Sequence, residues 1–287
     1  MIEHLILTSG GPHGIVQIGV LCAAEEFGIL DTSLLKSIHG CSSGALIGAL
    51  LCFKVPLKDM SEYAVSRNWS KCVHYTLDKF YETKGCVEPS IIHDIVVPFM
   101  KAYDIPLEIT LKEFYELTHV EFDIMTTDVT DIRSVKLNHT TFPDLSLLTA
   151  LTMSSAIPVI FPPVKYLGRY YMDGVYRRHC PMVDYPEEKT FIVYIDAAYS
   201  EEIPCLDDTS VYFQHIIGTS YRILTESSCI PKGIFIRCRD IPTPFSPEFW
   251  KRVLYQEEYR KELFEKGKMM FSTEIEKIDL SDVYKDA

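Results

Sequence analysis

Short apolar runs alternate along this chain with segments of helical spacing, and this alternation restricts the possible folds more than any other feature. Strands are predicted near residues 4–8, 37–40, 121–127, 133–137, 190–195 and 234–238. Helices are predicted near residues 15–23, 43–51, 56–67, 90–103, 144–155 and 211–224. Such alternation favours a mostly parallel sheet with helices on both faces, which is a three-layer α/β/α sandwich.

Two further helices are marked by capping signals. Thr110-Leu111-Lys112-Glu113 has the spacing of a capping box. Ser246, followed by Pro247 at the first helical position, predicts the start of the last helix. No repeat or long linker divides the chain, so we expect one domain over residues 1–287. Several aromatic residues near the C-terminus have helical spacing, which is more typical of a core than of a lid or an interfacial surface: Phe213, Tyr221, Phe249, Trp250 and Tyr259.

Charge and composition exclude several classes of function. The net charge of −12 disfavours a nucleic-acid partner and gives no general attraction to anionic membranes. The chain has no run of apolar residues long enough to span a bilayer, and its N-terminus lacks the basic region of a signal peptide. Nine cysteines occur without CxxC pairs, which argues against a zinc site and against a disulfide framework. We therefore expect a cytoplasmic protein with reduced thiols.

Gly40-Cys41-Ser42-Ser43-Gly44 matches the G-x-S-x-G pattern and lies between a predicted strand and a predicted helix. At such a turn the serine is held in a strained conformation with its hydroxyl group exposed, and the glycines remove side chains that would clash. The following helix directs its N-terminal amides and its dipole at any anion that forms near Ser42. The motif therefore indicates a nucleophilic serine; the alternative is a Gly/Ser-rich turn that only happens to fit.

A second glycine-rich segment, Ser9-Gly10-Gly11-Pro12-His13-Gly14, also lies between a strand and a helix. A dinucleotide loop would need a glycine at position 9, where this chain has a serine. It would also need one clear acidic ligand for the ribose further on, and several acidic residues compete for that place. The segment fits an oxyanion hole better, because Gly10 and Gly11 offer unhindered amide donors. Pro12 has no N–H and can only stiffen the loop. A plain tight turn is the third interpretation.

Asp173, in Tyr171-Met172-Asp173-Gly174, lies near the end of a predicted β-ribbon. A serine nucleophile needs a base, and a carboxylate group held against its hydroxyl group can act as one. An aspartate before a glycine is also common in plain turns. The residues alone do not place Asp173 beside Ser42, so its role stays open at this point.

Five segments resemble, in the right order, motifs of the patatin-like phospholipase family. They are Leu5 to Leu30 with its glycine loop, Gly40 to Gly44, Phe122 to Thr130, Ser154 to Pro163, and Asp173-Gly174 followed by Pro181. They cover a core of about residues 4–196 and leave the C-terminal helices and strand, about 197–287, outside the resemblance. The implied fold is the patatin-like, modified α/β-hydrolase-like sandwich.

The resemblance implies a Ser42–Asp173 dyad without a catalytic histidine. Ser42 attacks an ester carbonyl while Asp173 takes its proton, and the oxyanion is stabilised by amides of the loop that contains Gly10, Gly11 and Gly14. No metal or cofactor is implied. The implied partner is a lipid substrate, a phospholipid or related glycerolipid, and transient peripheral contact with a membrane is compatible with it. Which ester is cut and the oligomeric state stay open.

Several residues depart from the pattern of the family, among them Val175, which replaces the small residue after Asp-Gly. Ser9 replaces the first glycine of its G-x-G-x-x-G loop, and Arg177-Arg178-His179 stands where asparagines are common. His13 stands where the family usually has Arg or Lys, so a positive charge in the loop is either lost or made pH-dependent. The two arginines are either a headgroup contact or a solvated basic cluster.

Two other classes of function remain open. One is an α/β-hydrolase with a Ser-His-Asp triad, in which His179 or His215 is the base. That fold usually places several elements before its nucleophile, whereas only 41 residues precede Ser42. The other is a non-catalytic lipid-binding protein on the same scaffold, which the intact serine and aspartate disfavour.

Overall fold

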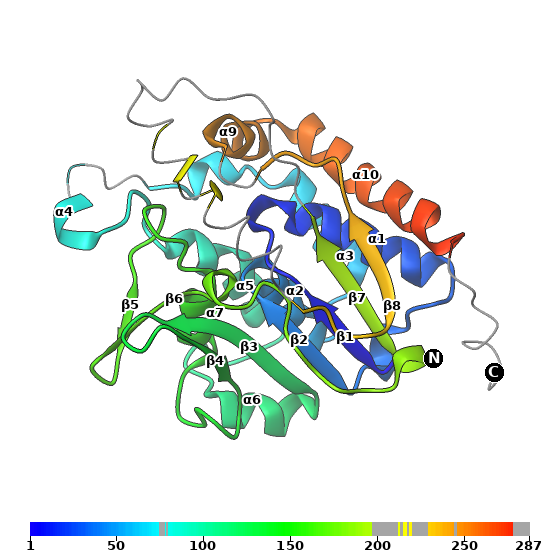
Figure 1. Cartoon of the computed structure of the whole chain (residues 1–287), viewed down its shortest axis with the longest axis horizontal. Coiled ribbons are helices and arrows are strands. Elements are labelled where there is room, and N and C mark those ends of the chain that lie inside the picture. The colour runs from blue at the N-terminus through cyan, green and yellow to red at the C-terminus, as the bar shows by residue number, and fades with distance from the viewer. Residues whose placement is uncertain are drawn as a thin grey trace.

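The computed structural model describes residues 1–74, 78, 80–196, 212, 215–216, 218–219, 229–243 and 246–277. Their strands form one eight-stranded sheet in the order β5-β6-β3-β2-β1-β7-β8, with β4 also paired to β3 (Figure 1). The strands are β1 (His4–Leu7), β2 (Ser37–Cys41), β3 (Glu121–Asp128), β4 (Arg133–Leu137), β5 (Val164–Tyr166), β6 (Arg169–Asp173), β7 (Thr190–Ile195) and β8 (Ile234–Cys238).

The sheet is mixed. β3, β2, β1, β7 and β8 are parallel neighbours, so their carboxyl ends lie at the same edge. β4 and β6 pair with β3 in the antiparallel direction, and β5 pairs with β6 in the same way. All residues of β2 and β7 are buried, as expected for strands that are covered on both faces.

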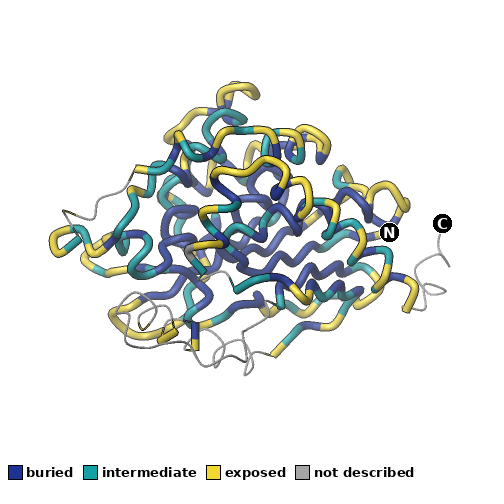
Figure 2. Tube along the Cα trace, turned by 90° about the horizontal axis from the view of Figure 1, so that it is seen from above, coloured by how far each residue is buried: buried dark blue, intermediate teal, exposed yellow. Residues whose placement is uncertain are grey.

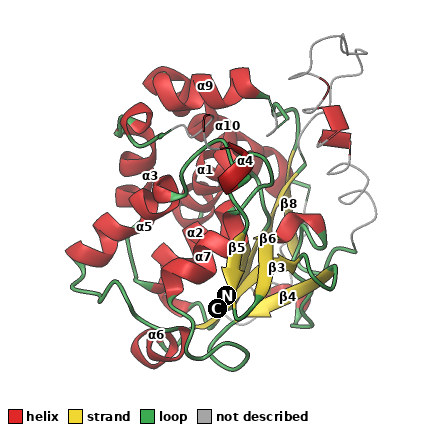
Figure 3. Cartoon of the chain, turned by 90° about the vertical axis from the view of Figure 1, so that its left-hand side faces the viewer, coloured by secondary structure: helices red, strands yellow, loops and turns green. Residues whose placement is uncertain are grey.

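The α-helices are α1 (Gly14–Glu26), α2 (Ser43–Cys52), α3 (Leu57–Ser66), α4 (Phe80–Thr83), α5 (Ser90–Ala102), α6 (Leu111–Thr118), α7 (Leu147–Ser155), α9 (Pro247–Tyr255) and α10 (Glu257–Ile275). Most of them lie on one side of the sheet (Figure 3). The main core lies between this layer and the sheet, and it includes Leu5 and Leu7 of β1. None of the described helices is long and apolar enough to cross a membrane.

The opposite face of the sheet has its own smaller core. Ile6, Ile192 and Tyr194 pack there against Cys180 and Val183. Both of the latter come from the segment between two short 3-10 helices, η5 (Gly174–Tyr176) and η6 (Glu187–Lys189). The strands are therefore buried from both sides (Figure 2). This confirms the predicted α/β class and its layered arrangement.

Both capping predictions are confirmed, with one correction. Thr110 Oγ1 accepts from the backbone N–H of Glu113 at 3.2 Å, and Glu113 Oε2 accepts from the N–H of Thr110 at 2.9 Å. Ser246 caps α9, which begins at Pro247. The prediction that this helix is the last one is wrong. Gln256 has an extended backbone, with φ −118° and ψ 106°, and it separates α9 from the longer helix α10.

The other boundaries agree closely with the sequence. The helix predicted from residue 144 begins only at Leu147, because Ser146 is its N-cap and accepts from the N–H of Thr149 at 3.3 Å. Most of the helix predicted at 211–224 lies outside the described residues. The single-domain organisation stays a prediction.

Candidate active site

Ser42 alone forms the turn between β2 and α2, and its backbone is strained. Its φ of 54° and ψ of −123° lie in a region that non-glycine residues rarely adopt and that is frequent at functional sites. The backbone N–H of Ser42 donates to Ser154 Oγ at 2.9 Å, and Ser154 Oγ donates to the carbonyl oxygen of Met125 at 2.6 Å. The end of α7 and the strand β3 therefore hold this turn in place.

The two glycines of the motif allow α2 to pack directly on the strands. A Cβ at Gly44 would lie 2.4 Å from the carbonyl oxygen of Leu7, and a Cβ at Gly40 would lie 2.6 Å from the Cα of Ala45. Side chains at these positions would therefore push α2 away from the sheet. With glycine at both, the N-terminus of α2 and its dipole stay directed at Ser42.

Asp173 ends β6 and is buried beside Ser42, with 1% of its surface exposed. Its Oδ1 accepts from the backbone N–H of Val175 at 2.9 Å and from the thiol of Cys41 at 3.9 Å. The Ser42 hydroxyl group interacts with the same carboxyl group and lowers its pKa. Among the described residues, Oδ2 has no hydrogen-bond partner of ordinary geometry. Oδ2 is thus the oxygen that is available to receive a proton.

Burial raises the pKa of Asp173 to about 7, although its interactions with Ser42, Val175 and Cys41 each lower it. A carboxyl group that titrates near neutral pH can both accept and return a proton, as a general base must. Gly174 keeps this strand end close to β3, since a Cβ there would lie 2.5 Å from the carbonyl oxygen of Met125.

The glycine loop borders the same cavity as Ser42. Gly11 has a φ of 53°, which favours glycine. Within the described part of the chain, the amides of Gly10 and Gly11 make no hydrogen bond. The amide of Gly14 donates to the carbonyl groups of Gly11 and Pro12, so it is not free to bind an oxyanion. The loop therefore offers two amide donors, and Gly14 contributes only to the cavity wall.

Buried Gln17 joins this loop to the serine turn. Its Nε2 donates to the carbonyl oxygen of Thr8 at 2.7 Å, and its Oε1 accepts from Ser43 Oγ at 3.3 Å. Thr8 Oγ1 accepts from the N–H of Ile195 at 2.9 Å, which fixes the loop to the end of β7. The loop and the turn that carries Ser42 are thus held by a shared network.

Ser9, the first residue of the glycine loop, forms a buried hydrogen-bonded pair with His179. His179 Nε2 lies 3.0 Å from the carbonyl oxygen of Ile195, which can only accept, so Nε2 carries the proton. His179 Nδ1 then accepts from the hydroxyl group of Ser9 at 2.7 Å. Burial lowers the pKa of His179 to about 4, so the ring is neutral at pH 7. Both ring nitrogens bond groups other than Ser42, and His215 is exposed.

His13 is also buried and brings no positive charge to the loop. Burial lowers its pKa to about 4. Its Nδ1 donates to the carbonyl oxygen of Gly10 at 3.0 Å, and its ring stacks on Phe249 with the centroids 4.5 Å apart. It therefore connects the loop to α9. Arg177 is exposed, Arg178 is half-buried, and neither lines the cavity.

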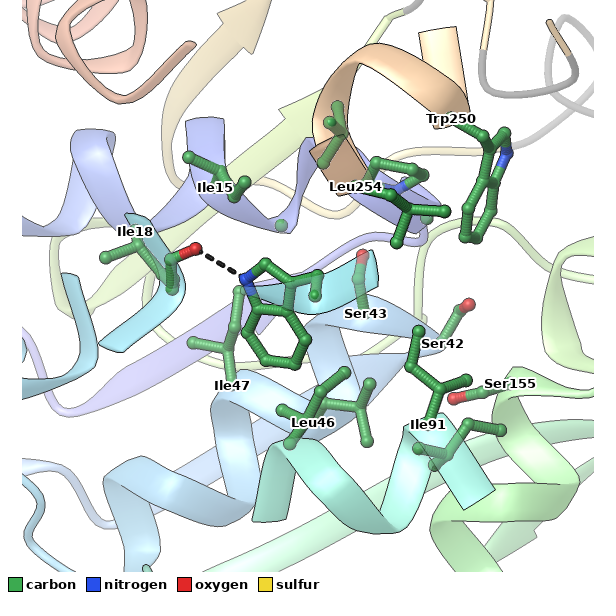
Figure 4. A pocket seen from close by; sticks show the side chains of 18 of the residues that line it. Ile15, Ile18, Ser42, Ser43, Leu46, Ile47, Ile91, Ser155, Trp250 and Leu254 are labelled. Atoms are coloured by element: carbon green, nitrogen blue, oxygen red, sulfur yellow. Dashed lines mark hydrogen bonds between the residues drawn. The ribbon is translucent and has the colours of Figure 1, made fainter. Parts of the chain in front are cut away.

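The cavity at Ser42 has a volume of about 160 Å³, and no charged side chain of the described residues lines it. Figure 4 shows Ser42, Ser43 and Ser155 together with aliphatic side chains of several helices. The labelled aliphatic residues are Ile15, Ile18, Leu46, Ile47, Ile91 and Leu254. No group of three or more His, Cys, Asp or Glu side chains in the described part of the chain is arranged to hold a metal ion.

Sequence reasoning missed the part of this wall that comes from the C-terminal region. Trp250, Val253 and Leu254 of α9 line the cavity, and their spacing of three and four residues was the available signal. Phe249 and Tyr259 are buried in the core, as expected. Phe213 and Tyr221 lie outside the described residues.

Most of this chain matches a known protein family. The sequence model described as "Patatin-like phospholipase" covers residues 5–184, from the strand before the glycine loop to beyond Asp173. The chain belongs to the patatin-like phospholipase family.

The chain is also similar to two proteins whose names refer to lipid hydrolysis. The chain is 26% identical over 177 residues to the probable lipid hydrolase 463L of Invertebrate iridescent virus 6, which covers 60% of this chain and 59% of the viral protein. It is 27% identical over 186 residues to lysophospholipase NTE1 of Cryptococcus neoformans, which covers 62% of this chain and 10% of the fungal protein. The chain thus matches 59% of one relative and a tenth of the other.

A solved structure shares the fold over nearly the whole chain. VipD from Legionella pneumophila superposes with a TM-score of 0.58 at 16% sequence identity, and the match covers 96% of this chain and 67% of the VipD chain. The similarity extends beyond residue 184 and so includes the C-terminal region that lies outside the match to the family.

Proposed function

We propose that this protein is a lipid acyl hydrolase that cleaves carboxylic ester bonds of phospholipids or related glycerolipids. The observation that carries the proposal is the pairing of a strained serine, Ser42, with the buried carboxyl group of Asp173 beside an apolar cavity. The patatin-like phospholipase family and the two relatives, a probable lipid hydrolase and a lysophospholipase, support a lipid as the substrate.

The proposed reaction has two halves. In the first, Ser42 Oγ attacks the acyl carbonyl carbon while Asp173 Oδ2 takes the hydroxyl proton. The amides of Gly10 and Gly11 stabilise the oxyanion, and the alcohol leaves with the proton that Asp173 returns. In the second, Asp173 takes a proton from a water molecule, and the resulting hydroxide attacks the acyl-serine ester. When that intermediate collapses, Asp173 returns the proton to Ser42 Oγ, which releases the carboxylic acid and restores the free serine.

The cavity supports an aliphatic acyl group as the part of the substrate that is bound. At about 30 Å³ for each water-sized group, a volume of about 160 Å³ gives room for roughly five such groups. Each methylene buried against the aliphatic wall stabilises the complex by about 0.8 kcal/mol. The acyl chain therefore binds in the cavity, and the polar headgroup stays outside it.

The proposal is tested by incubating the purified protein with phospholipids, lysophospholipids, neutral glycerolipids and galactolipids. We expect free fatty acid and the matching deacylated lipid, both identified by mass spectrometry. A serine-reactive fluorophosphonate probe should label Ser42 in the same preparation. Folded protein that forms no product and takes up no label would favour the non-catalytic lipid-binding alternative.

Chelation separates this mechanism from one that depends on a metal. Because backbone amides rather than a metal ion stabilise the oxyanion in the proposed reaction, activity in excess EDTA should stay within about twofold of the untreated rate. The rate of nitrophenyl ester hydrolysis after dialysis against EDTA measures this. Loss of activity that is restored by calcium or zinc would contradict the proposed site.

A further inference from the structure

Two adjacent serines at the end of α7 have different surroundings. Ser154 Oγ accepts from the backbone N–H of Ser42 and donates to the carbonyl oxygen of Met125, so it is fully used by the fold. Ser155 Oγ has no hydrogen-bond partner among the described residues, although Ser155 is only 5% exposed. Ser155 lines the cavity together with Ser42 (Figure 4).

A buried hydroxyl group without a partner destabilises a fold, and native proteins contain few of them. The wall of the same cavity includes the apolar side chains of Ile91, Ile157 and Phe161. A water molecule in such surroundings finds few of the polar partners that it needs. The hydroxyl group of Ser155 is therefore unsatisfied in the free protein, and a ligand that brings an acceptor into the cavity would satisfy it.

The backbone around Ser155 is fixed to both members of the Ser42–Asp173 pair. Its neighbour Ser154 bonds the N–H of Ser42, and its other neighbour, Ala156, accepts from the N–H of Asp173 at 2.9 Å. The carbonyl oxygen of Ser155 itself accepts from the N–H of Ile157 at 2.9 Å. Ser155 therefore keeps a constant position relative to the atoms that would react.

A lipid acyl ester brings only one kind of polar group into this cavity. The acyl chain has no hydrogen-bonding atoms, whereas the ester has two oxygens and lies at Ser42 during the reaction. We propose that Ser155 binds the reacting ester by donating a hydrogen bond from its hydroxyl group to an ester oxygen. This inference rests on the proposed function. It adds a side-chain donor to the two backbone donors, Gly10 and Gly11.

The hydrogen bond from Ser155 to the ester should be stronger in the transition state than in the bound substrate. The carbonyl oxygen gains negative charge when the tetrahedral intermediate forms, and the alkoxyl oxygen gains it when that intermediate collapses. A donor to either oxygen therefore acts mainly on kcat and less on KM. A residue with a purely structural role would instead alter folding stability.

The test is the Ser155→Ala variant, measured on nitrophenyl esters. We expect kcat to fall about 10-fold to 100-fold, with KM within about threefold of the wild-type value. We expect the midpoint of thermal unfolding to stay the same or rise, because the variant removes a buried hydroxyl group that has no partner in the free protein.

Ser134→Ala is the matched control. Ser134 lies on β4, its hydroxyl group is also buried without a partner among the described residues, and it does not line the cavity. It should change thermal stability in the same direction as Ser155→Ala and leave kcat unchanged.

Three results distinguish the inference from the proposed function. An unchanged kcat in Ser155→Ala, with an active wild type and an inactive Ser42→Ala variant, overturns the inference and leaves the proposed function intact. A lower kcat that is matched by a lower unfolding midpoint shows a structural role and also overturns the inference. A folded wild type that neither hydrolyses esters nor reacts with the fluorophosphonate probe overturns the proposed function, and the inference with it.

Discussion

Replacing Ser42 with alanine is expected to lower the rate of short-chain nitrophenyl ester hydrolysis by about 10⁴-fold or more, and to abolish fluorophosphonate labelling. The side chain supplies the nucleophile, and no other group in the proposed mechanism replaces it. Residual catalysis from the amide donors and from substrate binding sets the lower limit of the rate. Initial rates at saturating substrate measure the effect.

The variant should remain folded, because the backbone N–H of residue 42 still donates to Ser154 Oγ. Circular dichroism and the thermal midpoint check this. Ser134→Ala again serves as a control, since Ser134 is a serine away from the cavity and should keep wild-type turnover. A folded Ser42→Ala variant with near-wild-type turnover would contradict the proposed nucleophile.

The elements that could be predicted from the sequence are those whose signal is local. The buried strand β1 is a short apolar run, and the capping box at Thr110 lies within four consecutive residues. The position of Ser42 between a strand and a helix follows from the same local pattern. Each of these depends on residues that are close in sequence, so periodicity and capping rules apply to them directly.

The contact between Ser42 and Asp173 could not be derived in this way. It depends on the antiparallel pairing of β6 with β3, in which Thr126 lies opposite Asp173, and on the parallel pairing of β3 with β2. Neither register is encoded in a local pattern. Only the resemblance to the family indicated that the two residues act together.

The cavity could not be predicted from the sequence for a similar reason. Its wall combines residues of α1, α2, α5 and α9, and an apolar helix face has the same spacing whether it packs in a core or borders a cavity. The roles of His13 and His179 could not be predicted from the sequence either. Their charge and partners depend on burial, which places His179 against Ser9 and His13 against Phe249.

Asp173→Asn should lower kcat by about 10³-fold, because an amide group cannot accept the proton of Ser42. His215→Ala should have little effect, since that residue is exposed. His179→Ala removes the partners of Ser9 and of the Ile195 carbonyl group, so it should lower thermal stability while the folded protein keeps most of its kcat. Rates corrected for the folded fraction measure all three variants.

The pH dependence tests the role of Asp173 through two quantities that change in opposite directions: the reaction rate rises with pH, and the stability that comes from Asp173 falls. The pKa of Asp173 is raised to about 7 from its ordinary value near 3.8, so the rate should rise as the pH increases through about 7 and then reach a plateau. The folded state binds this proton more tightly than the unfolded chain does, so the associated stability is present below about pH 4 and is lost as the pH rises through about 7. At about 1.4 kcal/mol per pKa unit, the loss is on the order of 4 kcal/mol.

Asp173→Asn should remove both effects together, because the amide does not titrate. Its free energy of unfolding should then exceed that of the wild type above pH 7, although its activity is lower. An imidazole base would give a similar rise in rate near neutral pH, so the variants decide between the two. A folded His179→Ala or His215→Ala variant that is as inactive as Ser42→Ala would exclude the Ser42–Asp173 dyad and favour a Ser-His-Asp triad.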